Sequence, residues 1–217
     1  MRNKIAVIGE CMLEVTSPAG SDNNQLPLPA GLSFGGDTLN TAIYLARLGI
    51  DVDYVSALGD DDMSDWMLIQ WRAEGVGCDL VSRVENKVPG LYMIQLDDQG
   101  ERSFLYWRSN SPATKMFDNA NEAKTLFDRL SAYQHIYLSG ISLAIYTETA
   151  RHRLFGFLKN YRARGGNVIF DGACIWYAQG LSSPPGHVLP ATGKARPQGP
   201  DPRVQRMTAN VFDRFIK

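Results

Sequence analysis

Two adjacent glycines, Gly35 and Gly36, stand directly before a segment with the pattern of a helix start. Glycines allow a tight turn and a close approach of the backbone to a ligand. Asp37 and Asn40 would place short polar groups on the first helical turn, where free backbone N–H groups favour oxygen-rich ligands. The segment therefore suits a polyhydroxylated or anionic ligand. An ordinary helix start, with Asp37 or Thr38 as the N-cap, explains the same residues equally well.

Charge and composition argue against several classes of partner. Lys and Arg number 22 against 23 for Asp and Glu, which gives a formal net charge of −1. No basic excess favours a nucleic-acid backbone or an anionic membrane surface. The longest apolar runs have the length of strands, and the N-terminus shows no signal-peptide cleavage pattern. We therefore expect a cytoplasmic protein without a nucleic-acid or membrane partner.

The residues that most often bind metals are scattered. Cys11, Cys78 and Cys174 leave one thiol unpaired in any disulfide scheme and form no paired ligand spacing. The three histidines form no His-Glu-x-x-His arrangement. The acidic triplet at 60–62 is better explained as a helix cap that complements the helix dipole than as a metal cluster. We expect no metal bound by protein ligands.

Strand and helix patterns alternate along most of the chain. Uniformly apolar or strand-like runs occur at 5–9, 52–58, 135–138 and 167–171, and helical periodicity occurs at about 38–48, 63–71, 121–130 and 147–163. Apolar runs without polar alternation are typical of buried parallel strands. This order predicts an α/β fold with a mostly parallel central sheet flanked by helices. Such sheets bind ligands at the carboxyl ends of their strands, which here carry Ser139 and Asp171.

Residues 79–107 have a different pattern. Extended segments are predicted at 79–84, 90–96 and 102–107, and Asp97-Asp98-Gln99-Gly100 links the last two as a hairpin. A period of two places Arg102, Phe104, Tyr106 and Arg108 on one face and Ser103, Leu105 and Trp107 on the other. Because both faces carry large groups, we expect at least partial cover on both sides. Earlier in the chain, residues 11–16 are predicted to be extended and 17–33 to be a long irregular connection.

The last part of the sequence is rich in proline and glycine. Residues 181–202 contain six prolines and several glycines with almost no apolar periodicity. Such a composition buries too little apolar surface to offset the entropy lost on ordering. We expect a largely disordered tail over 172–217, in which only 204–216 could form a short helix.

Several motifs occur together in one order. They comprise Gly35-Gly36 with Asn40-Thr41-Ala42, Gly49 and Gly59, and the segments 5–14, 89–92, 100–108 and 137–145. With this set, residues 4–171 resemble the N-terminal part of a PfkB, or ribokinase-like, carbohydrate kinase, and specifically its 2-keto-3-deoxygluconate kinase branch. Thr38 departs from the small residue usual in the general pattern. The resemblance implies a central α/β sheet, with the C-terminal part missing, and a small β-lid formed by about 11–34 and 79–108.

The resemblance also implies roles for named residues. Gly35, Gly36, Asp37 and Asn40 would form the substrate floor, and Tyr92 and Tyr106 would be lid residues that bond substrate hydroxyls. Arg108 would hold a sugar-acid carboxylate, because a planar guanidinium can donate two parallel hydrogen bonds to it. Glu10 would meet sugar hydroxyls or orient the lid. The alternatives are a solvated charge for Arg108, aromatic cross-strand packing for the tyrosines and helix capping for Asp37.

Other implied features include ATP with Mg²⁺ as the phosphoryl donor and a homodimer formed through the lid. However, the family's Asp-Thr-x-Gly-Ala-Gly-Asp type motif, which supplies the catalytic base and anion hole, has no counterpart here. The Asn-Tyr-Arg-Pro-like segment expected after Asp171 is also replaced. We therefore expect no catalytic base in this chain and little kinase activity from it alone. A frameshift, a gene-model error or a deliberate fragment would explain the abrupt change.

Two alternatives to a 2-keto-3-deoxygluconate kinase remain open at this point. One is another PfkB sugar or nucleoside kinase. The other is a non-catalytic sugar-acid-binding or interaction fragment.

Overall fold

A five-stranded parallel sheet forms the centre of the computed structural model, which describes residues 4–16, 26–96 and 102–172. Its strand order is β5-β4-β1-β8-β9, and every neighbouring pair is parallel. The strands are β1 (Lys4–Ile8), β4 (Asp51–Gly59), β5 (Gly77–Val84), β8 (His135–Ser139) and β9 (Asn167–Asp171). The α/β class and the mostly parallel sheet expected from the sequence are thus confirmed.

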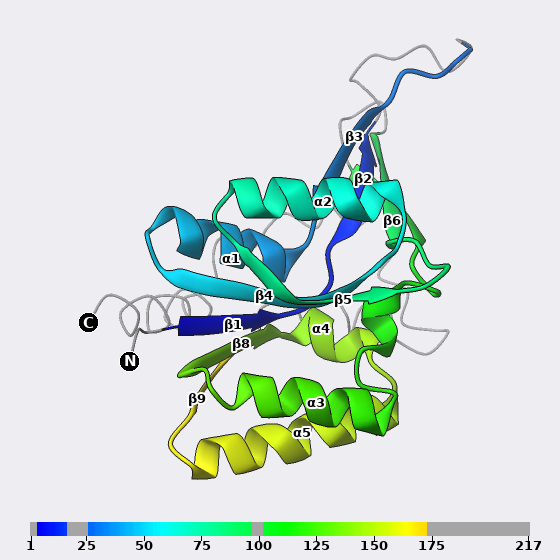
Figure 1. Ribbon diagram of the computed structural model, residues 1–217. Coiled ribbons are helices and arrows are strands. Elements are labelled where there is room, and N and C mark those ends of the chain that lie inside the picture. Colours follow the sequence, from blue (N-terminus) through cyan, green and yellow to red (C-terminus); the bar gives the residue numbers. More distant parts are fainter. Residues whose placement is uncertain (1–3, 17–25, 97–101, 173–217) are drawn as a thin grey trace, which may run out of the picture.

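Helices cover both faces of this sheet. Helices α1 (Asp37–Arg47) and α2 (Asp62–Ala73) lie above it in Figure 1, and α3 (Ala120–Leu130), α4 (Gly140–Ile145) and α5 (Glu148–Ala163) lie below. Successive residues of β1 point to opposite faces, so Ile5 and Val7 join one apolar cluster while Ala6 and Ile8 join the other. The uniformly apolar sequence of β1 therefore reflects burial on both sides.

Local sequence signals fix the helix boundaries. Asp61 is the N-cap of α2, and its carboxylate accepts hydrogen bonds from the Met63 and Ser64 amides at 3.0 and 3.1 Å. The expectation that the acidic triplet caps a helix is confirmed. Helices α1, α2 and α5 are each followed by a glycine with positive φ, namely Gly49, Gly75 and Gly165.

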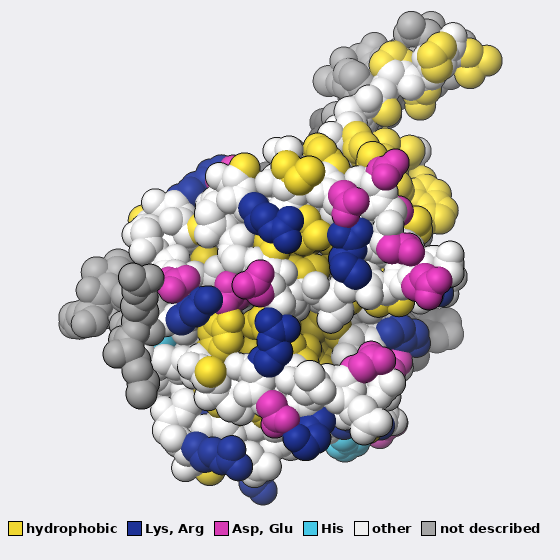
Figure 2. All heavy atoms as spheres, viewed as in Figure 1, with side chains coloured by type: hydrophobic (Ala, Val, Ile, Leu, Met, Phe, Trp, Pro, Cys, Tyr) yellow, Lys and Arg dark blue, Asp and Glu magenta, His cyan; other side chains and the backbone are white. Residues whose placement is uncertain are grey.

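A second, four-stranded sheet forms the β-lid. Its order is β3-β2-β6-β7, with β2 (Met12–Thr16), β3 (Gly31–Gly35), β6 (Leu91–Leu96) and β7 (Arg102–Trp107). Strands β2 and β6 are parallel, and the two outer pairs are antiparallel. This sheet extends away from the helices and central sheet in Figure 1, and Figure 2 shows hydrophobic side chains along its projecting part.

Two details of the predicted lid were wrong. Residues 31–33 were expected to belong to an irregular connection, but they lie in β3, which pairs with β2 in antiparallel register. Their glycine-flanked sequence is typical of a loop, and only pairing with a distant segment makes it a strand. Residues 79–84 belong to β5, which pairs with β4 in the central sheet, so the second lid segment begins at β6.

Other expectations differ from the structure in smaller ways. Helix α4 and the short 3-10 helix at Pro112–Lys115 were not predicted. Residues 104–107 of the lid are 43–58% exposed, so the expected cover on both faces is not provided by the described residues. The linker 97–100 and the tail from 173 lie outside the described residues. No helix within the described ranges has the length and apolar character needed to cross a membrane.

Candidate functional site

The two glycines lie where the lid meets the central sheet. Gly35 ends β3, and Gly36 is the N-cap of α1, so neither Asp37 nor Thr38 caps this helix. A Cβ atom added to Gly35 would lie 2.3 Å from the Tyr92 hydroxyl oxygen, and one added to Gly36 would lie 2.5 Å from the Glu10 carbonyl oxygen. Close approach rather than a positive φ therefore favours glycine at both positions, most strongly at Gly36, where the neighbouring atoms belong to the backbone.

Thr38, which departs from the family pattern, has a matching environment. It is fully buried, and its hydroxyl lies 3.0 Å from that of Tyr54. A Cβ atom added to Gly9 would lie 2.0 Å from the Thr38 hydroxyl oxygen, so the glycine at the end of β1 leaves the space that Thr38 fills. The absence of a side chain at Gly9 and the contact with Tyr54 thus accommodate Thr38 in the core.

The predicted lid tyrosines face each other across two strands. Tyr92 in β6 pairs with Tyr106 in β7, and their ring centroids are 6.0 Å apart. The Tyr92 hydroxyl donates a hydrogen bond to the Glu14 carboxylate in β2. Burial and this hydrogen bond both raise the pKa of Tyr92, so its hydroxyl stays a donor at neutral pH. Cross-strand packing and a ligand-facing role are compatible for these tyrosines.

An ion pair joins the lid to the central sheet. Arg108, which follows β7, donates from Nη2 to Oε2 of Glu10, which follows β1. The Glu10 side chain is 2% exposed and that of Arg108 is 26% exposed. The Arg108 guanidinium carbon also lies 5.8 Å from the centroid of the Tyr106 ring. Two residues predicted for the site are thus bound to each other.

Three polar atoms in this region are buried without a hydrogen-bond partner among the described residues. They are Oε1 of Glu10, Nε of Arg108 and Oδ2 of Asp37. A buried polar atom without a partner is costly, and such atoms in native proteins are usually satisfied by water or a ligand. Their grouping in one region indicates a place where a polar ligand would bind.

The carboxyl ends of β8 and β9 contribute a further set of polar groups. The Tyr137 hydroxyl donates to Asp171 at 3.2 Å, and the Thr41 hydroxyl lies 3.4 Å from that of Tyr137. Burial raises the pKa of Asp37, although a hydrogen bond from Ser139 opposes this shift, and the nearby charge of Asp171 adds to it. The predicted location at the ends of these strands therefore adjoins the glycine floor.

Sequence reasoning missed some members of this arrangement and placed one differently. Glu14, Thr41 and Tyr137 were not predicted as site residues, although all three fall within the motifs that carry the family resemblance. Asn40 is exposed on the first turn of α1, where its backbone N–H donates to the Gly36 carbonyl at 2.9 Å. Its substrate role stays a prediction, as do those of the other predicted residues.

The described residues provide no evident metal site. Among them, no group of three or more His, Cys, Asp or Glu side chains is arranged to hold a metal ion. Cys11 and Cys78 are buried free thiols, and burial raises the pKa of Cys78 to about 11. Such thiols are mostly protonated and unreactive at neutral pH.

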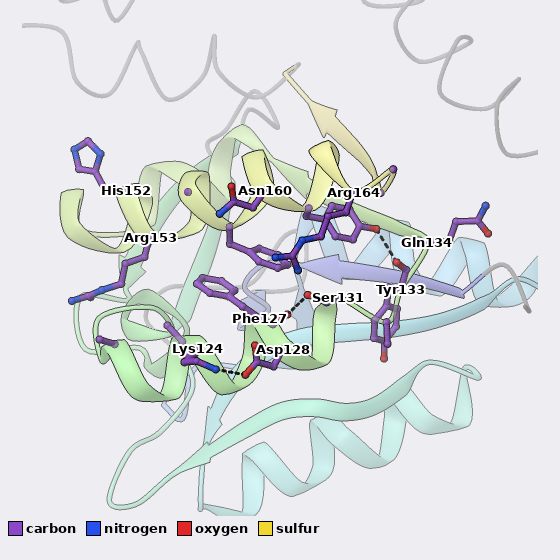
Figure 3. Close-up of a pocket in the computed structure, with 18 residues that line it drawn as sticks. Lys124, Phe127, Asp128, Ser131, Tyr133, Gln134, His152, Arg153, Asn160 and Arg164 are labelled. Carbon is purple, nitrogen blue, oxygen red and sulfur yellow. Dashed lines mark hydrogen bonds and ion pairs between the residues drawn. The ribbon is translucent and has the colours of Figure 1, made fainter.

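A groove of about 1080 Å³ lies between α3 and α5, away from the predicted site (Figure 3). Its floor contains Phe127 and Phe157, whose rings stack 4.4 Å apart, and a hydrogen bond of 2.9 Å joins Tyr161 to the Tyr133 carbonyl. Its loops lead into the amino ends of β8 and β9. Ligands of open α/β sheets bind at the opposite, carboxyl ends, so this groove is not the candidate site.

Comparison with known proteins agrees with this arrangement. Residues 2–175 match the model of the pfkB family carbohydrate kinases. Over 171 residues the chain is 48% identical to a 2-dehydro-3-deoxygluconokinase of Dickeya dadantii (strain 3937), covering 77% of this chain and 52% of the relative. A 2-dehydro-3-deoxygluconokinase of Escherichia coli (strain K12) is 46% identical over 175 residues, covering 79% and 54%.

Solved structures show the same fold at lower identity. The fructokinase of Xylella fastidiosa superposes with a TM-score of 0.67 at 23% identity, covering 78% of this chain and 50% of the other. For the 2-dehydro-3-deoxygluconokinase of Thermotoga maritima the TM-score is 0.64 at 24% identity, with coverage of 77% and 50%. The chain spans about half the length of the relatives it matches. The family match extends over most of the chain and includes both the floor and the lid, so the chain belongs to the pfkB family of carbohydrate kinases.

Proposed function

We propose that this chain carries the sugar-binding part of a 2-keto-3-deoxygluconate kinase and binds that sugar acid between the glycine floor and the β-lid. The observation that carries the proposal is 45–48% identity to proteins named 2-dehydro-3-deoxygluconokinase. Residues 2–175, which match the family model, include every residue predicted for the site. We further propose that residues 1–171 form this part of the domain and that 172–217 is a divergent tail.

The geometry supports a sugar acid as the ligand. Hydroxyl groups would bond the floor and the lid tyrosines, and the carboxylate would bond Arg108. A guanidinium has five N–H donors in a planar fork, of which the described contact with Glu10 uses one at Nη2. The Nε donor of Arg108 is buried without a partner. Arg108 can therefore bond a carboxylate while it remains paired with Glu10.

Kinases of this family use ATP, generally with Mg²⁺, and the donor transfers a phosphoryl group to a sugar hydroxyl. The residues of this chain do not fit that donor: the motif for the base and the anion hole does not occur in the sequence. Phosphoryl transfer depends on positioning and charge stabilisation by such groups. We therefore infer that this chain binds the sugar acid but does not phosphorylate it unaided.

Calorimetry with 2-keto-3-deoxygluconate, with and without ATP and Mg²⁺, tests the proposal. We expect binding by the wild-type chain that does not depend on nucleotide, and loss of most affinity in Arg108→Ala. Arg47→Ala is the matched control, because Arg47 pairs with Glu74 at 2.7 Å in a similar ion pair on the surface. No binding by the wild-type chain would refute the proposed ligand, and ATP-dependent turnover would refute the inferred inactivity.

Another sugar kinase remains the alternative within the family. Fructokinase of Escherichia coli is 28% identical over 172 residues, and its substrate by name is a neutral sugar. If this chain resembles it in specificity, fructose would bind at least as tightly as the sugar acid, and Arg108→Ala would affect both ligands equally.

We also propose the lid as the contact surface for a second copy of the chain. Leu105 and Trp107 lie on the lid face opposite Tyr106 and are 43% and 58% exposed. Light scattering should show a dimer that Leu105→Lys converts to a monomer. A monomeric wild-type chain at high concentration would contradict this proposal.

A further inference from the structure

Carboxylates outnumber cations around the candidate sugar site. Glu14 approaches the floor, because a Cβ atom added to Gly35 would lie 3.4 Å from its Oε2 atom. Asp37 begins α1 directly after Gly36, and the charge of Asp171 acts on it. Glu10 lies beneath the lid. The cation that the described contacts place in this group is Arg108, which is already paired with Glu10.

Burial makes this pairing obligatory for Glu10. Its side chain is 2% exposed, and an isolated carboxylate in such a place would be strongly unfavourable. The ion pair with Arg108 offsets that cost. Arg108 therefore does not act as a free positive charge toward a ligand, because one negative charge of the protein already balances it.

We propose that Glu10 is a positioning residue that restricts this site to sugar acids with a single negative charge, by holding Arg108 in place and neutralising it. The inference rests on the proposed function, since it concerns the ligand of the same site. One ligand carboxylate can share the guanidinium, because Nε of Arg108 is buried without a partner. A second carboxylate or a phosphate on the ligand would meet the carboxylates of Glu14 or Asp37, for which the described contacts provide no cation partner.

Like charges at a separation of several ångströms in a partly buried site repel strongly, whereas a hydroxyl at the same place would donate to those carboxylates. The site thus favours a polyhydroxylated ligand that carries one carboxylate at one end. We therefore expect six-carbon dicarboxylic sugar acids and sugar phosphates to bind more weakly than the monoanion because of their additional negative charge.

Calorimetry on the full chain with three ligands provides the test. The ligands are 2-keto-3-deoxygluconate with one negative charge, galactarate with two, and fructose with none. We expect the wild-type chain to bind the monoanion at least about tenfold more tightly than the dianion. Glu10→Gln keeps the shape of the side chain and removes its charge. It should therefore reduce the ratio of monoanion affinity to dianion affinity by roughly tenfold.

Two further variants serve as controls. Glu10→Asp keeps the charge and should keep most of the preference for the monoanion. Glu74→Gln removes an exposed carboxylate that is paired with Arg47 on the surface and should leave the ratio unchanged. A purely structural role for Glu10 would weaken all three ligands together and leave their ratio constant.

The outcomes separate the two proposals. Equal wild-type affinity for the monoanion and the dianion would overturn the charge restriction while leaving sugar-acid binding intact, and this measurement requires no variant. A constant ratio in Glu10→Gln would overturn the role of Glu10. Absence of binding to any sugar acid by the wild-type chain would overturn the proposed function, and the restriction with it.

Discussion

Replacement of Gly35 by alanine should reduce both sugar binding and stability. The added Cβ atom would lie 2.3 Å from the Tyr92 hydroxyl oxygen and 3.4 Å from Oε2 of Glu14. Both atoms are ends of side chains, so the lid can relieve the overlap by moving the Tyr92 ring. That movement breaks the hydrogen bond between Tyr92 and Glu14 and displaces a residue predicted to contact the substrate.

The expected loss of stability is estimated from the overpacking and from the broken hydrogen bond. Overpacking by one methyl group costs about 1–3 kcal/mol, and a hydrogen bond to a charged group contributes about 1.5–3 kcal/mol. Because the side chains can rearrange, we expect a loss of about 2 kcal/mol in unfolding free energy, or roughly 4–8 °C in Tm. Affinity for 2-keto-3-deoxygluconate should fall by at least about tenfold.

Gly36→Ala and Gly156→Ala serve as comparisons for Gly35→Ala. A Cβ atom at Gly36 would lie 2.5 Å from the carbonyl oxygen of Glu10 and 3.1 Å from the Cα atom of Cys11, which are backbone atoms that cannot turn away. Gly36→Ala should therefore destabilise the fold more than Gly35→Ala. Gly156 in α5 has open space around it, so Gly156→Ala should stabilise the helix by about 0.5–1 kcal/mol. Calorimetry would measure the affinity for the sugar acid, and circular dichroism would follow thermal unfolding. Normal binding of the sugar acid by Gly35→Ala would refute this reasoning.

Two further predictions concern Tyr137 in β8 and Asp37 at the start of α1. Tyr137→Phe removes the hydroxyl that donates to Asp171 at 3.2 Å, and should lower the unfolding free energy in urea by about 1 kcal/mol; Tyr44→Phe on the surface is its control and should change little. Burial raises the pKa of Asp37 above its ordinary value of 3.8, so ionisation of Asp37 opposes folding as pH rises through the folded-state pKa. Asp37→Asn should thus stabilise the protein at about pH 7 and less so as pH falls toward 3.8, and a gain independent of pH in urea titrations would contradict this.

The central sheet was predictable because its strands are buried on both faces. Continuous apolar runs such as 5–8 and the helical periodicity between them specify parallel strands with helical crossovers without reference to distant residues. The lid was less predictable at its borders. Residues 31–35 become a strand only through pairing with β2, and residues 79–84 form the edge strand of the central sheet with a pattern like that of a lid strand.

The sequence indicates which residue types a candidate site would use, but not how those residues pair, and their binding roles stay predictions. Glycines, tyrosines and an arginine in a known order indicate a sugar-acid site, and the structure brings Glu10 and Arg108 together from positions 98 residues apart. No local pattern indicates which carboxylate pairs with Arg108 or that Glu14 accepts from Tyr92. Such pairings depend on the position of the lid over the sheet, which is a tertiary property.

The same contacts couple lid position to ligand affinity. Arg108 bonds Glu10 from the end of β7, and the Leu13 amide donates to the Gly90 carbonyl at 2.8 Å at the start of β6. Both strands of the lid hairpin are thus attached to the segment that leaves β1. We expect a ligand that bonds Arg108 and the floor together to stabilise this position of the lid, because it gains both sets of contacts only there. By linkage, we expect a substitution that weakens the Glu10–Arg108 pair to weaken binding by loosening the lid, apart from its effect on charge.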